Sequence, residues 1–450
     1  MENHKSMSAS QLEYGRILQQ AWPLILANAA VPILGLVDTA VIGNLGSIED
    51  LGAIAFGAMI FSFVYWGFGF LRLGTTGFVA QALGANDQVE IRSILGRSLL
   101  MAVSLGLILI VLQWPIQIIA FAVLDGSEAV EKTARAYFSI RIWGAPATLA
   151  SFVGAGLLIG LGKNRLLLGL QLFINGLNII LDIVFAGGLG MGAAGIALGT
   201  VIAEWSAVLV GTWIIYHSLH VSHGSNEPFW SLQRIIDREK VKIAVAANLD
   251  IMIRTLLLVF SFAFFTNQSA QFGDMVLAAN HILLQIISFA AFFLDGFAFV
   301  AEALVGKAYG ANDRATFKAA VKRTSELAVG SGILLALIVL VFGPLFVSVL
   351  TDIESVRSYT SGLCYVAAIY ILLSVAAFQL DGIFIGVSFT RQMRNAAIQS
   401  LGVFLLAWWL LIDVFAVTGL WWAMIIYVVA RALCLLRYYP AIFPAKRELR

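Results

Sequence analysis

The sequence predicts an all-α integral membrane protein of twelve transmembrane helices, built as two parallel repeats of six. Of its 450 residues 60% are hydrophobic and only 12% charged, whereas a soluble chain is about a quarter charged. Apolar stretches of the roughly 20 residues that a bilayer span needs recur from end to end. The net charge of +2 gives no indication of nucleic-acid binding. The two cysteines lie in separate apolar stretches, which argues against a disulfide framework.

Glycine, proline and charged clusters divide the apolar stretches into spans. In the first half we expect spans near 17–42, 50–72, 95–122, 136–161, 166–187 and 192–217. In the second half we expect them near 243–266, 276–300, 319–350, 360–387, 395–416 and 418–438. The polar segment 218–242 is the expected cytosolic linker between an N-lobe, 1–217, and a C-lobe, 243–450. The first 16 residues are polar, so we expect no cleaved signal peptide.

The distribution of basic residues predicts the orientation. On this division 22 of the 28 Lys and Arg residues fall on one side of the membrane and 3 on the other. Basic loops stay in the cytosol, so both termini are expected there. We expect a plasma-membrane protein, in bacteria an inner-membrane one, that works as a monomer in the lipid bilayer.

The chain repeats itself at an offset of 226 residues. Residues 51–87 align without a gap on 277–313, and both segments end in Gly-Ala-Asn-Asp. The same offset pairs Gly156 with Gly382 and Gly160 with Gly386. Each half holds an even number of predicted spans, so the two halves share one orientation. Parallel repeats of this kind favour a transporter that works by alternating access.

Polar residues form a stripe on the fifth predicted span. Gln171, Asn175, Asn178 and Asp182 are spaced 4, 3 and 4 residues apart, which places them on one helical face. The sixth span adds two polar residues one turn apart, and the first span adds an acid in an apolar run: Thr200, Glu204 and Asp38.

An ionisable group at membrane depth costs at least about 2.5 kcal/mol, so each one needs a reason to be there. Carboxylate, amide and hydroxyl oxygens could bind Na⁺. They could equally form a proton site, because burial favours the neutral form of a carboxyl group. The alternative is that these groups only join helices by hydrogen bonds. Pro23 and Pro32 are expected to kink the first helix, either as a hinge or as a static bend.

The second half carries different polar residues. Asp250 and Arg254 are four residues apart and are expected to form a structural ion pair. Asp295 and Glu302 either attract a cation or are solvated, and the role of Asp381 stays open. Other candidates without an assigned role or partner are His281, Arg141 and Arg431.

The sequence does not support an enzyme or a cofactor. No cluster of His, Cys or Ser has catalytic spacing. The segment Gly156 to Lys163 superficially suggests a phosphate loop, but it is one residue too long and no Ser or Thr follows the lysine. Coupling to an ion gradient is therefore the expected energy source.

Taken together, these motifs resemble the multidrug and toxic compound extrusion (MATE) transporters. The resemblance rests on Pro23 fifteen residues before Asp38, Asn178 with Asp182, Thr200 eighteen residues later, and the paired Gly-Ala-Asn-Asp turns. It covers nearly the whole chain. The basic segment Arg391 to Arg394 and the weaker acidic cluster of the second half are most similar to the DinF branch. One departure is Leu34, where some relatives carry a polar aromatic residue.

The resemblance implies a V-shaped pair of bundles that exports cationic drugs and dyes in exchange for H⁺ or Na⁺. It implies that Asp38 is the coupling acid and that Asn178, Asp182 and Thr200 shape its site, with Asn175, Gln171 and Glu204 as a supporting polar network. The expected substrate lining is Met59, Phe61, Phe152 and Phe173. The alternative function within transport is that of a lipid or lipid-linked sugar flippase, which often has more basic residues in its cavity.

Overall fold

The protein is almost entirely helical. The computed structural model describes residues 12–45, 47–123, 127–220 and 229–443, and no strand occurs among them. Ten helical segments of this part are long and apolar enough to cross a membrane. One of them, residues 390–441, contains two helices that meet at a non-helical Ala416, and α1 (Tyr14–Leu45) adds a further span of 32 residues. The predicted total of twelve is confirmed.

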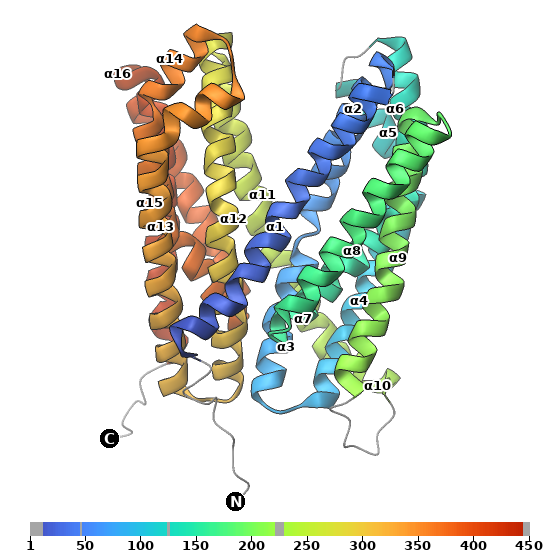
Figure 1. The fold of residues 1–450 in the computed structure, drawn as a ribbon. Coiled ribbons are helices and arrows are strands. Elements are labelled where there is room, and N and C mark those ends of the chain that lie inside the picture. The colour runs from blue at the N-terminus through green and yellow to red at the C-terminus, as the bar shows by residue number, and fades with distance from the viewer. Residues whose placement is uncertain (1–11, 46, 124–126, 221–228, 444–450) are drawn as a thin grey trace, which may run out of the picture. The chain divides into compact units, whose positions relative to one another are not determined.

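The chain folds as two compact units. The N bundle comprises residues 26–245, and the C bundle comprises, among the described residues, 12–25 and 246–443. Within each bundle the long helices run side by side (Figure 1). The structure thus groups the beginning of α1 with the C bundle. The lobes predicted at 1–217 and 243–450, and their V-shaped arrangement, stay predictions.

The helices of the N bundle after α1 are α2 (Ile48–Gly67), α3 (Phe70–Gly84), α4 (Gln88–Val111), α5 (Gln113–Val123), α6 (Glu128–Arg141), α7 (Ala145–Gly160), α8 (Asn164–Asp182), the π-helical η3 (Ile183–Gly188), α9 (Gly192–His220) and α10 (Leu232–Ile235). The helices of the C bundle are α11 (Arg238–Ala270), which begins in the N bundle, α12 (Asp274–Gly310), α13 (Arg314–Leu350), α14 (Glu354–Gly362), α15 (Cys364–Gly386) and α16 (Thr390–Tyr438).

Helix boundaries repeat at the offset of 226 residues that the sequence predicted. The starts of α2, α4 and α8 at residues 48, 88 and 164 correspond to the starts of α12, α13 and α16 at residues 274, 314 and 390. The break inside α16 at Ala416 corresponds to Gly190, which lies between η3 and α9, and both residues have a positive φ, 50° and 64°. The two halves therefore share these helix boundaries.

The two Gly-Ala-Asn-Asp segments form equivalent turns. Asn86 and Asn312 have φ angles of 58° and 53°, a left-handed conformation that asparagine tolerates better than most residues. The following aspartates cap the next helices: Asp87 accepts a hydrogen bond from the Glu90 amide at 2.8 Å, and Asp313 accepts one from the Thr316 amide at 3.0 Å. The motif is therefore a helix-stop and helix-start signal.

Helices extend beyond several predicted spans because of these caps. The span predicted at 276–300 is part of α12, residues 274–310, and the span predicted at 319–350 is part of α13, residues 314–350. The span predicted at 50–72 is the α2–α3 pair, which reaches residue 84. Hydropathy marks the part of a helix that lies in the bilayer, whereas the capping residues mark where the helix ends.

In the N bundle, two glycines let α7 cross α3 with the backbones in close approach. A Cβ atom on Gly156 would lie 2.4 Å from the carbonyl oxygen of Arg72, and one on Gly160 would lie 2.9 Å from that of Thr76. No larger residue fits without moving a helix. Small residues that allow such approach are the usual basis of helix packing in membranes.

The C bundle repeats this crossing between α15 and α12. A Cβ atom on Gly382 would lie 2.4 Å from the carbonyl oxygen of Ala298, and one on Gly386 would lie 2.6 Å from that of Glu302. All four residues are related to their N-bundle counterparts by the same offset. The glycine pairs predicted from the sequence repeat therefore mark the same helix crossing in each half.

We expect Gly382→Ala to destabilise the C bundle, because the added methyl group meets backbone atoms of α12 that cannot rotate away. The matched control is Gly402→Ala in α16, where a Cβ atom meets nothing within 4 Å and helix propensity should raise stability slightly. The measurement is the thermal unfolding midpoint of both purified variants in detergent. Equal midpoints would show that the crossing does not depend on Gly382.

Candidate functional site

The predicted polar stripe on α8 lies together in the structure. Asn178 is 1% exposed and Asp182 is fully buried at 0%, while Asn175 is also buried. Gln171 Nε2 donates a hydrogen bond to Asn175 Oδ1 at 3.2 Å, and Asn178 Nδ2 donates one to Asp182 Oδ1 at 3.1 Å. The two residues of each pair are four positions apart in the sequence, which places them one helical turn apart.

Thr200 on α9 joins this stripe, as the resemblance predicted. Asn178 Nδ2 also lies within hydrogen-bond distance of Thr200 Oγ1, at 3.3 Å, and the Thr200 hydroxyl donates to the Ile196 carbonyl at 2.8 Å. Gly199 permits this approach, because a Cβ atom there would lie 2.7 Å from Asp182 Oδ1. Asn178, Asp182 and Thr200 therefore form one cluster between α8 and α9, which we call the α8–α9 site.

The backbone changes character directly after Asp182. Residues Ile183–Gly188 form a π-helix instead of continuing the α-helix. Such turns are rare and occur often at functional sites, because they rotate the side chains that precede and follow them. On α9, Gly195 lies against this segment: a Cβ atom there would be 2.8 Å from the Ala186 nitrogen.

The α8–α9 site has unused acceptor capacity. Asn178 Oδ1 is buried and accepts no hydrogen bond from any described residue. A buried acceptor without a donor is costly, about 1–3 kcal/mol, and such an atom calls for an explanation. Oxygen atoms of an amide, a carboxylate and a hydroxyl are the ligands that hard cations prefer. The cluster is thus chemically suited to a small cation or, through Asp182, to a proton.

The structure describes the side chains of α1 only in part. Pro23 is buried within the C bundle, whereas the side chains of Asp38 and Pro32 lie outside the described part of the chain, although α1 is helical there. Asn175 Nδ2 lies 3.4 Å from the carbonyl oxygen of Ala30. The polar stripe therefore reaches the backbone of α1 two residues before Pro32.

Glu204, predicted as part of the supporting polar network, has Arg141 as its partner. The structure pairs it with Arg141 in a two-pronged ion pair, with N–O distances of 2.9 and 2.6 Å, and both side chains are buried. A Cβ atom on Gly144 would collide with the Glu204 carboxylate at 2.3 Å, so the glycine makes room for the pair. Arg141 is one of the two arginines for which no partner was predicted. Its partner, Glu204, lies one helical turn after Thr200 on α9.

The four side chains predicted as a substrate lining lie in different surroundings. Phe61 is 5% exposed and packs beneath Arg141, 5.2 Å from the guanidinium carbon to the ring centre, whereas Met59 is 47% exposed. Phe152 is half-buried and Phe173 is exposed. The four side chains therefore differ widely in exposure, and their role as a lining stays a prediction.

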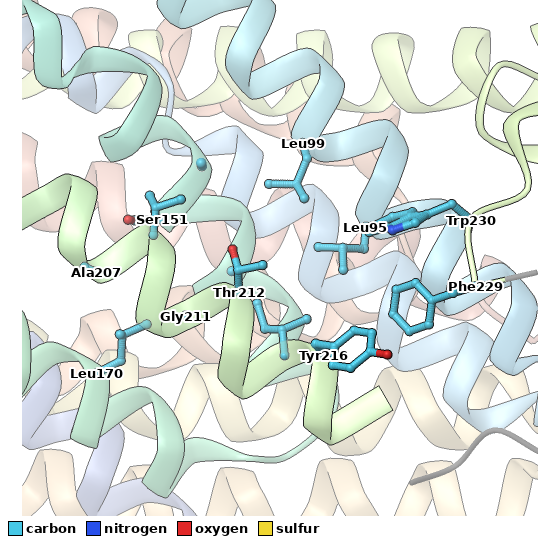
Figure 2. Close-up of a pocket in the computed structure, with 14 residues that line it drawn as sticks. Leu95, Leu99, Ser151, Leu170, Ala207, Gly211, Thr212, Tyr216, Phe229 and Trp230 are labelled. Carbon is cyan, nitrogen blue, oxygen red and sulfur yellow. The ribbon is translucent and has the colours of Figure 1, made fainter. Parts of the chain in front are cut away.

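A cavity of about 140 Å³ does lie in the N bundle, between α4, α7, α8 and α9 (Figure 2). Three aromatic rings lie together at one end of it, those of Tyr216, Phe229 and Trp230. The ring centre of Phe229 lies 5.3 Å from that of Tyr216 and 5.1 Å from that of Trp230. Sites for drug-sized molecules occupy roughly 300–1,000 Å³. This cavity alone is therefore too small to be a substrate site.

The ion pairs of the C bundle correct the sequence interpretation. Asp250 does not pair with Arg254; it accepts hydrogen bonds from Arg394 Nη1 at 2.7 Å and from the Thr390 hydroxyl at 3.2 Å. Arg254 instead forms an ion pair with Asp381. An i, i+4 spacing allows a pair but does not enforce it when a partner on another helix lies closer.

Asp381 is shared by two arginines. Arg431 Nη2 lies 2.6 Å from Asp381 Oδ2, and Arg254 Nη2 bonds to the same oxygen. Asp381 is therefore the acidic partner of Arg431, for which no partner was predicted. Glu302 is 1% exposed, so it is buried rather than solvated, and Asp295 is half-buried. His281 is exposed and lies within hydrogen-bond distance of Gln285.

Sequence comparison identifies a family. The family model MatE matches residues 23–184 and again residues 251–409, one match for each repeat. DNA damage-inducible protein F of Escherichia coli (strain K12) is 36% identical over 380 residues, which cover 84% of this chain and 81% of that protein. Probable multidrug resistance protein NorM of Acinetobacter baylyi is 28% identical over 284 residues, 62% of each chain.

Solved structures share the fold. The Vibrio cholerae MATE transporter VcmN in its bent form matches with a TM-score of 0.85 at 19% identity, covering 96% of this chain and 97% of that one. An outward-facing multidrug resistance MATE family transporter matches with a TM-score of 0.85 at 17% identity, covering 97% and 98%.

We expect Arg141→Met to lower the stability of the protein by about 3–5 kcal/mol, because it leaves the Glu204 carboxylate buried without a counter-charge. The double variant Arg141→Met with Glu204→Leu should recover most of the loss. The control is Arg135→Gln, which removes an exposed pair with Glu131 and should cost less than about 1 kcal/mol. Unfolding in detergent, followed by intrinsic fluorescence, measures all three. No recovery in the double variant would contradict the charge argument.

Proposed function

The chain belongs to the MATE family and is a multi-pass membrane protein, and we propose that it is a cation-coupled antiporter that exports cationic and amphiphilic organic compounds by alternating access. Its relatives are transporters, among them proteins named for multidrug resistance. The proposal assigns the coupling ion, H⁺ or Na⁺, to the N bundle.

The observation that carries the proposal is the α8–α9 site. Asp182 is fully buried within a helix that is otherwise mostly apolar, beside an amide oxygen that has no donor. Holding an acid at membrane depth costs at least about 2.5 kcal/mol. An asparagine could join the helices by hydrogen bonds at lower cost, so helix joining alone is a weak reason for an acid at this position. A charge that changes during transport is a stronger one.

Either coupling ion is compatible with this chemistry. A proton would neutralise the carboxyl group and remove the cost of burying its charge. Sodium would bind to oxygens of Asp182, Asn178 and Thr200, with Asn178 Oδ1 gaining the partner that it lacks. In both cases the bound ion favours one conformation of the bundle over another, which is the requirement for coupling.

We assign the second coupling acid to Asp38 on α1. The stripe on α8 reaches α1 through Asn175 and the Ala30 carbonyl. Pro23 and Pro32 lie on either side of this contact and remove backbone hydrogen bonds from the helix, so α1 can bend there at low cost. A change of charge at Asp38 or Asp182 would then alter the shape of α1. Gln171 is assigned a supporting role through its hydrogen bond to Asn175.

The substrate is proposed to be a drug-like organic cation or amphiphile that enters from the cytosolic side. Met59, Phe61, Phe152 and Phe173 remain our candidates for apolar contacts with the substrate. We further propose a monomer in the bacterial inner membrane with both termini in the cytosol, which accords with 22 of the 28 basic residues on that side.

Neutralising the coupling acids should abolish efflux while the protein still folds. We expect Asp182→Asn and Asp38→Asn to reach the membrane in normal amounts but to lose drug resistance and ethidium efflux, because neither side chain can change its charge. The control is Glu354→Gln, whose side chain is 82% exposed at the start of α14. Efflux at the normal rate in the Asp182→Asn, Asp38→Asn double variant would refute the proposed coupling.

Purified protein in proteoliposomes should identify the ion and the substrate class. We expect ethidium movement to be driven by a proton gradient or a sodium gradient imposed separately, and to be absent without either. A fluorescent lipid in the same vesicles serves as the competing substrate. Gradient-independent movement of the lipid, without ethidium movement, would assign the protein as a flippase instead.

A further inference from the structure

Five charged side chains of the C bundle, in two groups of contacts, carry an excess of positive charge. Its cations are Arg254 on α11 with Arg394 and Arg431 on α16; its anions are Asp250 on α11 and Asp381 on α15. Both oxygens of Asp250 are occupied, by Arg394 and Thr390. Both remaining arginines bond to one oxygen of Asp381. Three guanidinium groups thus face two carboxylates, a net charge of +1.

No other described group neutralises this charge. Besides Asp381, the titratable groups that interact with Arg431 are Tyr370 and Tyr427. Tyrosine hydroxyls carry no charge near pH 7. The Arg431 and Asp381 side chains are only 10% and 12% exposed, so water compensates the excess charge poorly. An uncompensated charge in such surroundings is costly and favours a counter-ion.

The two arginines also retain unused donors. A guanidinium group has five N–H donors, and the Asp381 oxygen uses one from each arginine. The other nitrogen atoms of Arg254 and Arg431 form no hydrogen bond with the described residues. Donors are therefore available where the positive charge is concentrated.

A small cavity lies at this point. Arg254, Asp381 and Arg431 line it together with Tyr427, and its volume is about 10 Å³, roughly the space for one water-sized particle. The rest of its wall is apolar: Leu258, Met393, Ala396, Ala397 and Leu435. Apolar walls lower the local dielectric and strengthen the attraction between the guanidinium groups and an anion.

From this geometry we propose that the C bundle binds one small monovalent anion, of the size of chloride, between Arg254 and Arg431. The anion balances the charge of the group formed by Arg254, Arg431 and Asp381, and it accepts N–H donors that the protein leaves unused. The small cavity favours such an ion over organic acids, phosphate and sulfate. The site is separate from the α8–α9 site, which lies in the other bundle, and it stabilises the packing of α11, α15 and α16.

Thermal unfolding of the purified full chain in detergent tests the proposal. At constant ionic strength, we expect the unfolding midpoint to rise with chloride and to reach a plateau, because an anion that binds only the folded state stabilises it. Bromide should replace chloride, whereas gluconate, which is too large for the cavity, should have no effect. Identical midpoints in chloride and gluconate would overturn the proposal.

Variants locate the effect. Arg431→Gln removes the excess charge and should abolish the chloride response, whereas Arg437→Gln, an exposed arginine later on the same helix, should keep it. Ala397→Val fills the cavity without changing any charge and should also abolish the response, so the test does not depend on the folding of the Arg431 variant. A chloride response that persists in Ala397→Val would place the anion elsewhere.

Crystals grown in sodium bromide give a direct measurement on the unaltered protein. We expect an anomalous peak within hydrogen-bond reach of the Arg254 and Arg431 guanidinium groups. Ordered water without anomalous signal at that position would overturn the proposal.

Discussion

Close backbone contact between helices is the constraint on which the rest of this structure depends. Lipid is as apolar as a leucine side chain, so helices in a membrane gain little from hydrophobic burial and must associate by shape. The crossings of α3 with α7 and of α12 with α15 do this through glycines that bring carbonyl oxygens within 2.4–2.9 Å of where a Cβ would be. Because these crossings fix the frame of each bundle, the polar groups attached to it are held at constant separation.

The same device recurs at the polar sites. Gly199 allows α9 to reach Asp182, and Gly144 leaves room for the pair of Arg141 with Glu204. Glycines, which have no side chain, therefore allow the close approach of charged groups as well as of backbones. In the N bundle this produces a balanced ion pair and a separate buried acid. The C bundle holds charged groups in which arginine outnumbers aspartate. The two halves share the same helix crossings, whereas their charged residues differ.

The sequence was informative wherever a pattern is set by local geometry. Helical periodicity predicted that Asn178 and Asp182 lie one turn apart, and the 226-residue offset predicted equivalent turns at Asn86 and Asn312. Partners on different helices were not predictable in the same way. Arg254 has an acid four residues before it and nevertheless pairs with Asp381, since the approach of α15 decides which carboxylate is nearer. The contact of Arg141 with the Phe61 ring was likewise not predictable, because hydropathy does not say which side chains of different helices meet.

The break in α16 shows how unequally the two repeats bear the same bend. Gly190 adopts its positive φ freely, whereas Ala416 must hold its Cβ in a region of backbone conformation that costs roughly 1–3 kcal/mol outside glycine. The strain is retained because the following turn is tight: at Gly419 a Cβ atom would lie 2.3 Å from the Leu411 carbonyl oxygen. The second half of the molecule therefore holds a strained residue at a bend that the first half makes with glycine, and Ala416→Gly would relieve that strain.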